Sequence, residues 1–167
     1  MSETQNTDEV IRKLEDRDRA DEVRFQPVLS QAQEKIRTIV GNQPQISKED
    51  TGFRVDRFDL TSTYFQSGAF ALWAGILRPQ TFPSLMGEEF AGVIKNLRIP
   101  ENLRRSGLGK QIVQTWESTL SAHGIKSFLA TNIKDEEAIQ FWRKQGYDVP
   151  EDEKYKKNPY YMVKKID

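Results

Sequence analysis

The sequence has no cysteine and a single histidine, His123, among its 167 residues. The absence of thiols excludes disulfides, thiolate nucleophiles and cysteine-ligated zinc, and one histidine cannot form a histidine metal cluster. We therefore expect no bound metal.

Long apolar runs and an excess of either charge are also missing. Lys plus Arg and Asp plus Glu number 25 each, so no global field attracts nucleic acid or an anionic membrane. Without an apolar run near 18 residues or a charged-then-apolar leader, we expect a soluble, cytoplasmic protein. A chain of 167 residues has the length of one globular domain.

The N-terminal part divides by composition. Residues 1–22 are polar and charged, which predicts a solvated helix or frayed extension before a domain over 23–167. Residues 23–28, with Pro27 near their end, favour a first strand. Apolar residues at helical spacing predict a helix over 30–40.

The remaining segments show strand, loop and helix patterns. Strands are predicted over 53–60, 69–77, 90–99, 125–133, 147–149 and 160–164, a proline-rich loop over 78–89, and helices over 108–123 and 135–145. Gly124 and Gly146 suit the left-handed position that follows a helix. The C-terminal half therefore alternates strands and helices.

The stretch LRRSGLGKQIVQTW, residues 103–116, places glycines and cations at the start of a helix. The first amides of a helix lack intrahelical partners and point outward, which makes an anion site. Gly107 and Gly109 leave room for a phosphate beside these amides. The neighbouring cations are Arg104, Arg105 and Lys110.

Two familiar phosphate loops do not fit this stretch. A Walker loop needs glycine where Arg104 stands and Ser or Thr where Gln111 stands, and the Rossmann fingerprint needs glycine at Ile112. The alternative to an anion site is a tight turn whose glycines only permit close packing.

The wider pattern strongly resembles the GNAT N-acetyltransferase superfamily. LRIPENLRRSGLGKQIV, residues 97–113, resembles its acetyl-CoA signature, and TNIKDEEAIQFWRKQGY, residues 131–147, resembles its second signature. The resemblance spans about residues 90–147. It implies a mixed α/β fold whose central, largely antiparallel sheet carries one splayed parallel pair, the fourth and fifth strands, flanked by helices.

The resemblance also implies acetyl-CoA as cosubstrate. The backbone of Leu97 and Ile99 would bind the pantetheine arm between the splayed strands, and Asn132 would contact the cofactor. The pyrophosphate would be held by Arg104, Arg105, Ser106, Gly107, Leu108, Gly109 and Lys110. The second helix would flank the arm and the adenosine end through Phe141, Trp142 and Lys144.

The acid and base of such a reaction are harder to place. Many relatives have a tyrosine where Trp142 stands, and an indole cannot act as an acid, so packing is its expected role. The phenols of the C-terminal part are Tyr147, Tyr160 and Tyr161, none of which can be placed at the sulfur. A coenzyme A thiolate, with a pKa near ~8.5, leaves tolerably without an acid.

Fourth-strand carboxylates of relatives fall at positions that here hold Lys95 and Val93. Glu89 is therefore the candidate base, acting through a water, and the alternative is that it only aids solubility. The other acids considered are Glu88, Asp56 and Asp59.

The resemblance therefore implies acetyl transfer from acetyl-CoA to a primary amine, carried by a small molecule or a peptide. The transfer is expected to be direct, because the chain has no cysteine to carry an acyl intermediate. No motif specifies the acceptor, and a homodimer is left open. A non-catalytic acyl-CoA-binding or protein-interaction module is the competing class. His123 is expected to interact favourably with the dipole at the C-terminal end of the helix predicted over 108–123.

Overall fold

The computed structural model describes residues 3–43, 50–54, 59–78, 89–150 and 160–166. Its elements, in chain order, are α1 (Glu3–Gly41), β1 (Asp50–Arg54), β2 (Asp59–Ser67), β3 (Phe70–Leu77), β4 (Ala91–Arg98), the 3-10 turn η1 (Glu101–Leu103), α3 (Leu108–Ser121), β5 (Ser127–Ile133), α4 (Glu136–Lys144) and β6 (Tyr160–Lys165).

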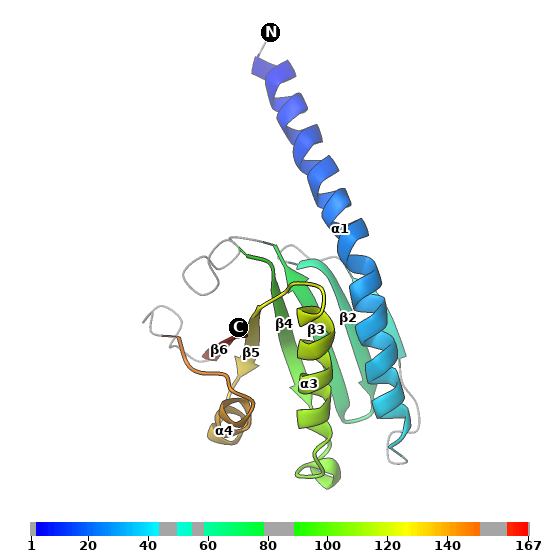
Figure 1. The fold of residues 1–167 in the computed structure, drawn as a ribbon, viewed down its shortest axis with the longest axis vertical. Coiled ribbons are helices and arrows are strands. Elements are labelled where there is room, and N and C mark those ends of the chain that lie inside the picture. The colour runs from blue at the N-terminus through cyan, green and yellow to red at the C-terminus, as the bar shows by residue number, and fades with distance from the viewer. Residues whose placement is uncertain (1–2, 44–49, 55–58, 79–88, 151–159, 167) are drawn as a thin grey trace.

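The described strands form one sheet in sequence order, β1-β2-β3-β4-β5-β6. Every neighbouring pair is antiparallel except β4 and β5, which are parallel and joined through α3. Helices flank this sheet (Figure 1). The predicted fold, a largely antiparallel sheet with one parallel pair, is confirmed.

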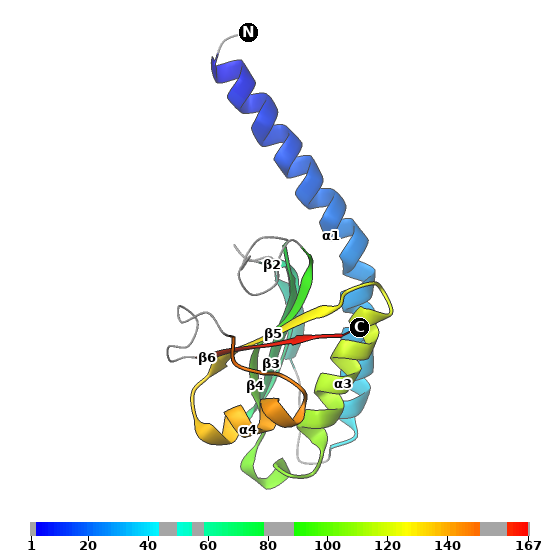
Figure 2. The same cartoon turned by 60° about the vertical axis from the view of Figure 1, so that its left-hand side comes forward.

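The core lies between the sheet and the paired helices α1 and α3, which run side by side in both ribbon views (Figures 1 and 2). Trp116 and Leu120 of α3 are 1% and 0% exposed there. A Cβ at Gly92 of β4 would lie 2.7 Å from Leu120 and 2.9 Å from Phe128. Glycine at this position therefore allows α3 to approach β4 closely.

The strand predicted over 23–28 is wrong, because these residues belong to α1 and Pro27 lies inside the helix. Phe25, Val28 and Leu29 are buried at helical spacing, in line with the buried Ala32 and Ile36. Burial of this stripe offsets the cost of an interior proline, about 3 kcal/mol. The helix predicted over 30–40 is confirmed.

The first half of α1 extends beyond the end of the sheet (Figures 1 and 2). Its large apolar side chains Val10, Ile11 and Leu14 are about half exposed. The helix continues across residue 22 without a break. The predicted charged extension is therefore helical. It forms one continuous helix with residues 23–41.

Two strand predictions need correction. The pattern over 53–60 belongs to two strands, since β1 ends at Arg54, β2 begins at Asp59, and Phe53 pairs with Thr63 across them. Over 147–149 the chain forms a single bridge, Asp148 to Val163, and not a strand. The other predicted strands and both C-terminal helices are confirmed, while 79–88 of the predicted loop lie outside the described residues.

Candidate cofactor site

The first turn of α3 presents backbone donors that the helix itself does not use. Gly107 is the N-cap, with φ +86° and no side-chain cap, and its carbonyl accepts from the Gln111 N–H at 3.0 Å. The N–H groups of the intervening residues 108–110 therefore precede the first intrahelical bond.

The loop before the helix satisfies two of its own amides. The Ser106 N–H donates to the Leu103 carbonyl at 3.3 Å, and the Leu108 N–H makes a long contact of 3.4 Å with Ser106 Oγ. Between residues 105 and 110, the other N–H groups have no acceptor within the described part of the chain. These are Arg105, Gly107, Gly109 and Lys110.

The two glycines have different surroundings. A Cβ at Gly107 would meet nothing within 4 Å, but its φ of +86° favours glycine. A Cβ at Gly109 would lie 3.1 Å from two ring atoms of Phe141 in α4. Gly109 thus serves close packing, whereas the backbone at Gly107 is open to an approaching ligand.

Positive charge surrounds these amides. The side chains of Arg104, Arg105 and Lys110 are exposed. Arg104 Nε donates to the Ile99 carbonyl at 3.3 Å, which ties the loop to the end of β4. Arg105 adopts φ +66°, a left-handed conformation that is strained for a residue with a Cβ. The loop therefore combines free donors, cations and local strain.

Beside the loop, β4 and β5 separate. Their pairing runs from Ala91–Ser127 to Ile94–Ala130 and then ends, although β4 continues to Arg98. A bulge shifts the β3–β4 register between Ile94 and Asn96, and Asn132 has φ +63° where β5 breaks register with β6. The end of β4, which carries Leu97 and leads to Ile99, is thus left without a partner in β5.

The predicted residues of α4 fall into two groups. Trp142 is 5% exposed, and its ring lies edge-on to Phe141 at 5.2 Å and to Tyr147 at 4.9 Å. Phe141 is half-buried against Gly109, and Lys144 is exposed at the helix end. Phe141 therefore lies at the loop, while Trp142 lies in the core behind it.

Tyr147 is buried and its hydroxyl donates to Glu117 at 2.8 Å. Burial, together with the adjacent Glu117 carboxylate, raises the pKa of this phenol far above its ordinary value. Tyr161 is half-buried on β6, and the side chain of Tyr160 lies outside the described part. A phenol held in this way is a poor proton donor to a departing thiolate.

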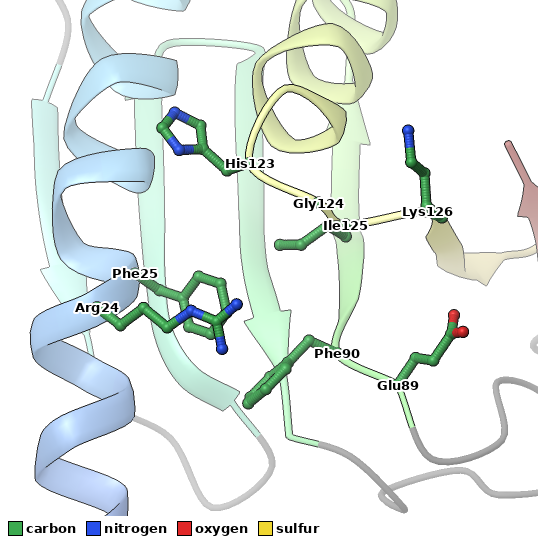
Figure 3. Close-up of a pocket in the computed structure, with 8 residues that line it drawn as sticks. All are labelled: Arg24, Phe25, Glu89, Phe90, His123, Gly124, Ile125 and Lys126. Carbon is green, nitrogen blue, oxygen red and sulfur yellow. The ribbon is translucent and has the colours of Figure 1, made fainter. Parts of the chain in front are cut away.

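Glu89 lies at the opposite end of β4 from the loop. Eight strand residues intervene, a separation of about 25 Å. Its carboxylate accepts from Ser127 Oγ at 3.2 Å and lines a pocket of about 230 Å³ with Arg24, Phe25 and Lys126 (Figure 3). The structure therefore does not bring this predicted base together with the loop and the separated strands.

The remaining predicted residues lie elsewhere. His123 follows α3 at the pocket end, with Nε2 3.1 Å from Gln31 Oε1. Glu88 and Asp56 lie outside the described residues, as does the side chain of Asp59.

Among the described side chains, no group of three or more His, Asp or Glu residues could hold a metal ion. Across the described ranges, no helix combines the length and apolar character needed to cross a membrane.

The FR47-like protein family matches residues 66–156, which is more than half of the chain. The match covers both the loop at the start of α3 and the separated strands. The chain belongs to this family, which is of the GNAT N-acetyltransferase type. A search of curated proteins finds no match.

Solved structures with a similar arrangement are distant in sequence. Ard1 of Thermoplasma volcanium is 15% identical, with a TM-score of 0.43 over 63% of this chain and 70% of its own. The Bacillus subtilis N-acetyltransferase YlbP, solved with coenzyme A, is 11% identical, with a TM-score of 0.48 over 64% and 69%. Arabidopsis thaliana Naa50, solved with a bisubstrate analogue, is 15% identical, with a TM-score of 0.46 over 63% and 72%.

Proposed function

We propose that the protein binds acetyl-CoA at the start of α3 and transfers its acetyl group to a primary amine of a small molecule or a peptide. The observation that carries this proposal is the set of unused amides at Arg105, Gly107, Gly109 and Lys110, next to the place where β4 and β5 part. Membership of the FR47-like family supports it.

The diphosphate and the pantetheine arm of acetyl-CoA bind to different parts of this site. The diphosphate accepts hydrogen bonds from the amides of α3's first turn, and the exposed cations around them add charge. The pantetheine arm lies along the end of β4 and pairs with the backbone at Leu97 and Ile99. Asn132, which has φ +63° in β5, would contact the cofactor.

The reaction is a direct displacement. The amine nitrogen attacks the thioester carbonyl, the carbon–sulfur bond breaks, the thiolate of coenzyme A leaves, and the amine releases a proton to water. A backbone N–H near Ile99 would stabilise the oxyanion. Because Glu89 is remote from this end of β4, the amine must reach the site largely uncharged, which favours an α-amine over a lysine side chain.

Release of free thiol from acetyl-CoA in the presence of a panel of amines tests this function. The chain has no cysteine, so the protein contributes no thiol background. We expect release that depends on both amine and protein. Gly107→Glu fills the open approach and repels the diphosphate, so it should strongly reduce the release when acetyl-CoA is below saturation.

A non-catalytic acyl-CoA-binding module is the second candidate. Two observations favour it: Glu89 lies far from the loop, and Tyr147 is committed to Glu117. Tight binding of coenzyme A without turnover of any amine would select this candidate over the enzyme.

A further inference from the structure

Three polar side chains from distant parts of the sequence meet in the interior behind α3. Glu117 accepts from Tyr147 OH at 2.8 Å on one carboxylate oxygen and from Lys164 Nζ at 2.7 Å on the other. The Glu117 side chain is 8% exposed and that of Lys164 is 25% exposed. This cluster, Glu117–Tyr147–Lys164, is both charged and largely buried.

The cluster joins three elements. Glu117 belongs to α3 and Lys164 to β6, while Tyr147 follows the end of α4. Lys164 Nζ also donates to the Gln145 carbonyl at 2.8 Å, and it lies 5.8 Å from the centre of the Tyr147 ring. The last turn of α4 is thus fastened to α3 and to β6 at one point.

From this point, contacts lead to the loop at the start of α3. The ring centroids of Tyr147 and Trp142 are 4.9 Å apart, and those of Trp142 and Phe141 are 5.2 Å apart. Phe141 lies 3.1 Å from the position of a Cβ on Gly109. Because this contact leaves no spare room, the position of α4 determines where Phe141 presses on the first turn of α3.

We propose that Glu117, Tyr147 and Lys164 are positioning residues for the diphosphate of coenzyme A. They do not touch the cofactor; they hold α4 so that Phe141 fixes the amides of Gly109 and its neighbours. This inference rests on the proposed function for its ligand. It goes beyond that function by assigning a role to a buried cluster remote from the reacting atoms.

Lys164 also contributes through its positive charge, which compensates the Glu117 carboxylate. Glu117 follows Lys110 by seven residues, about 10 Å along the helix. With Lys164 present, the carboxylate is neutralised. Without it, an uncompensated negative charge remains in α3, close enough to repel a bound diphosphate.

The test uses Tyr147→Phe, which keeps the ring and removes only the hydroxyl. Calorimetric titration measures the dissociation constants of coenzyme A and of pantetheine, which lacks the diphosphate. We expect the constant for coenzyme A to rise about tenfold, within the range of coupling through packed contacts. The constant for pantetheine stays unchanged.

Lys164→Met extends the test to the charge, and we expect it to weaken coenzyme A binding more than Tyr147→Phe does. Its matched control is Lys165→Met, the exposed lysine next to it on β6. Ile36→Val, in the buried part of α1, controls for a general loss of stability. Both controls should bind coenzyme A as the wild type does.

Amide chemical shifts of Gly107 and Gly109 in the unliganded protein supply a direct readout of the loop. Tyr147→Phe should move the Gly109 shift, and Ile36→Val should not. The inference is overturned if Tyr147→Phe and Lys164→Met lower the melting temperature yet leave these shifts and coenzyme A binding at wild-type values. If the wild type fails to bind coenzyme A, the proposed function is lost, while the Gly109 shift still decides whether the cluster positions the loop.

Discussion

Arg105 holds a left-handed backbone conformation in the middle of a loop rich in free donors. This conformation costs a residue with a Cβ about 1–2 kcal/mol. Strain of this kind persists where surrounding contacts impose it, and it clusters at ligand sites. A substitution at Arg105 can therefore separate the effect of this residue on stability from its effect on ligand binding.

Arg105→Gly relieves this strain and removes one cation. The relief exceeds the added chain entropy of glycine, about 0.5–1 kcal/mol, so the unliganded protein becomes slightly more stable. Coenzyme A binds several-fold more weakly, because one charged partner is lost. Thermal melts and calorimetric titration check the two effects. A variant that melts lower and binds equally well would show that Arg105 serves the fold alone.

Tyr147 predicts a pH dependence of stability. Its pKa is raised in the folded protein relative to about 10 in the unfolded chain. The folded state thus keeps a proton that the unfolded state loses, and stability falls as pH rises above about 10. Tyr147→Phe removes this contribution. Denaturant titrations at pH 8 and pH 11 measure it; an equal loss in both proteins would argue against the buried hydroxyl.

At the scale of elements, α3 fits against β4 because position 92 has no side chain. Gly92→Ala forces a Cβ into Leu120 and Phe128, and we expect it to lower the free energy of unfolding by about 1–3 kcal/mol. Gly41→Ala is the control, since a Cβ there meets nothing within 4 Å. Chemical denaturation compares the two, and equal stabilities would mean that the two side chains move aside freely.

Elements with a clear apolar period were predictable from the sequence. The stripe of α3 with its Gly124 cap, and the apolar runs of β3, β4 and β5, all appear where predicted. Residues 23–28 were not predictable because Pro27 and alternating polar residues resemble a strand end. They are helical because the buried stripe of α1 begins within them, at Phe25, and continues to Ile36.

The candidate cofactor site was predictable where it depends on a local pattern. The glycines before a predicted helix indicate free amides at its start, so the loop over residues 104–110 could be found from the sequence. The Glu117–Tyr147–Lys164 cluster could not, because Tyr147 and Lys164 lie 30 and 47 residues after Glu117 and the three carry no local pattern. The separation of Glu89 from the loop could be predicted, because Glu89 precedes the strand predicted over 90–99 and the loop follows it.

At the scale of the whole molecule, the first half of α1 stands apart from the domain (Figures 1 and 2). Burial in α1 begins at Phe25, and the described side chains of residues 3–20 are not buried. Deleting residues 1–20 should therefore change the free energy of unfolding by no more than about 0.5 kcal/mol. It should leave coenzyme A binding unchanged. A large loss of either would show that the extension belongs to the domain.

The central claim is that the open amides at the start of α3 bind the diphosphate of coenzyme A. Calorimetric titration of coenzyme A into the wild type and into Gly107→Glu tests it directly. We predict saturable binding to the wild type and a loss of about 10- to 100-fold in the variant, as expected when charged hydrogen bonds are removed. Equal affinity in the two proteins, or no binding to the wild type, would contradict the account.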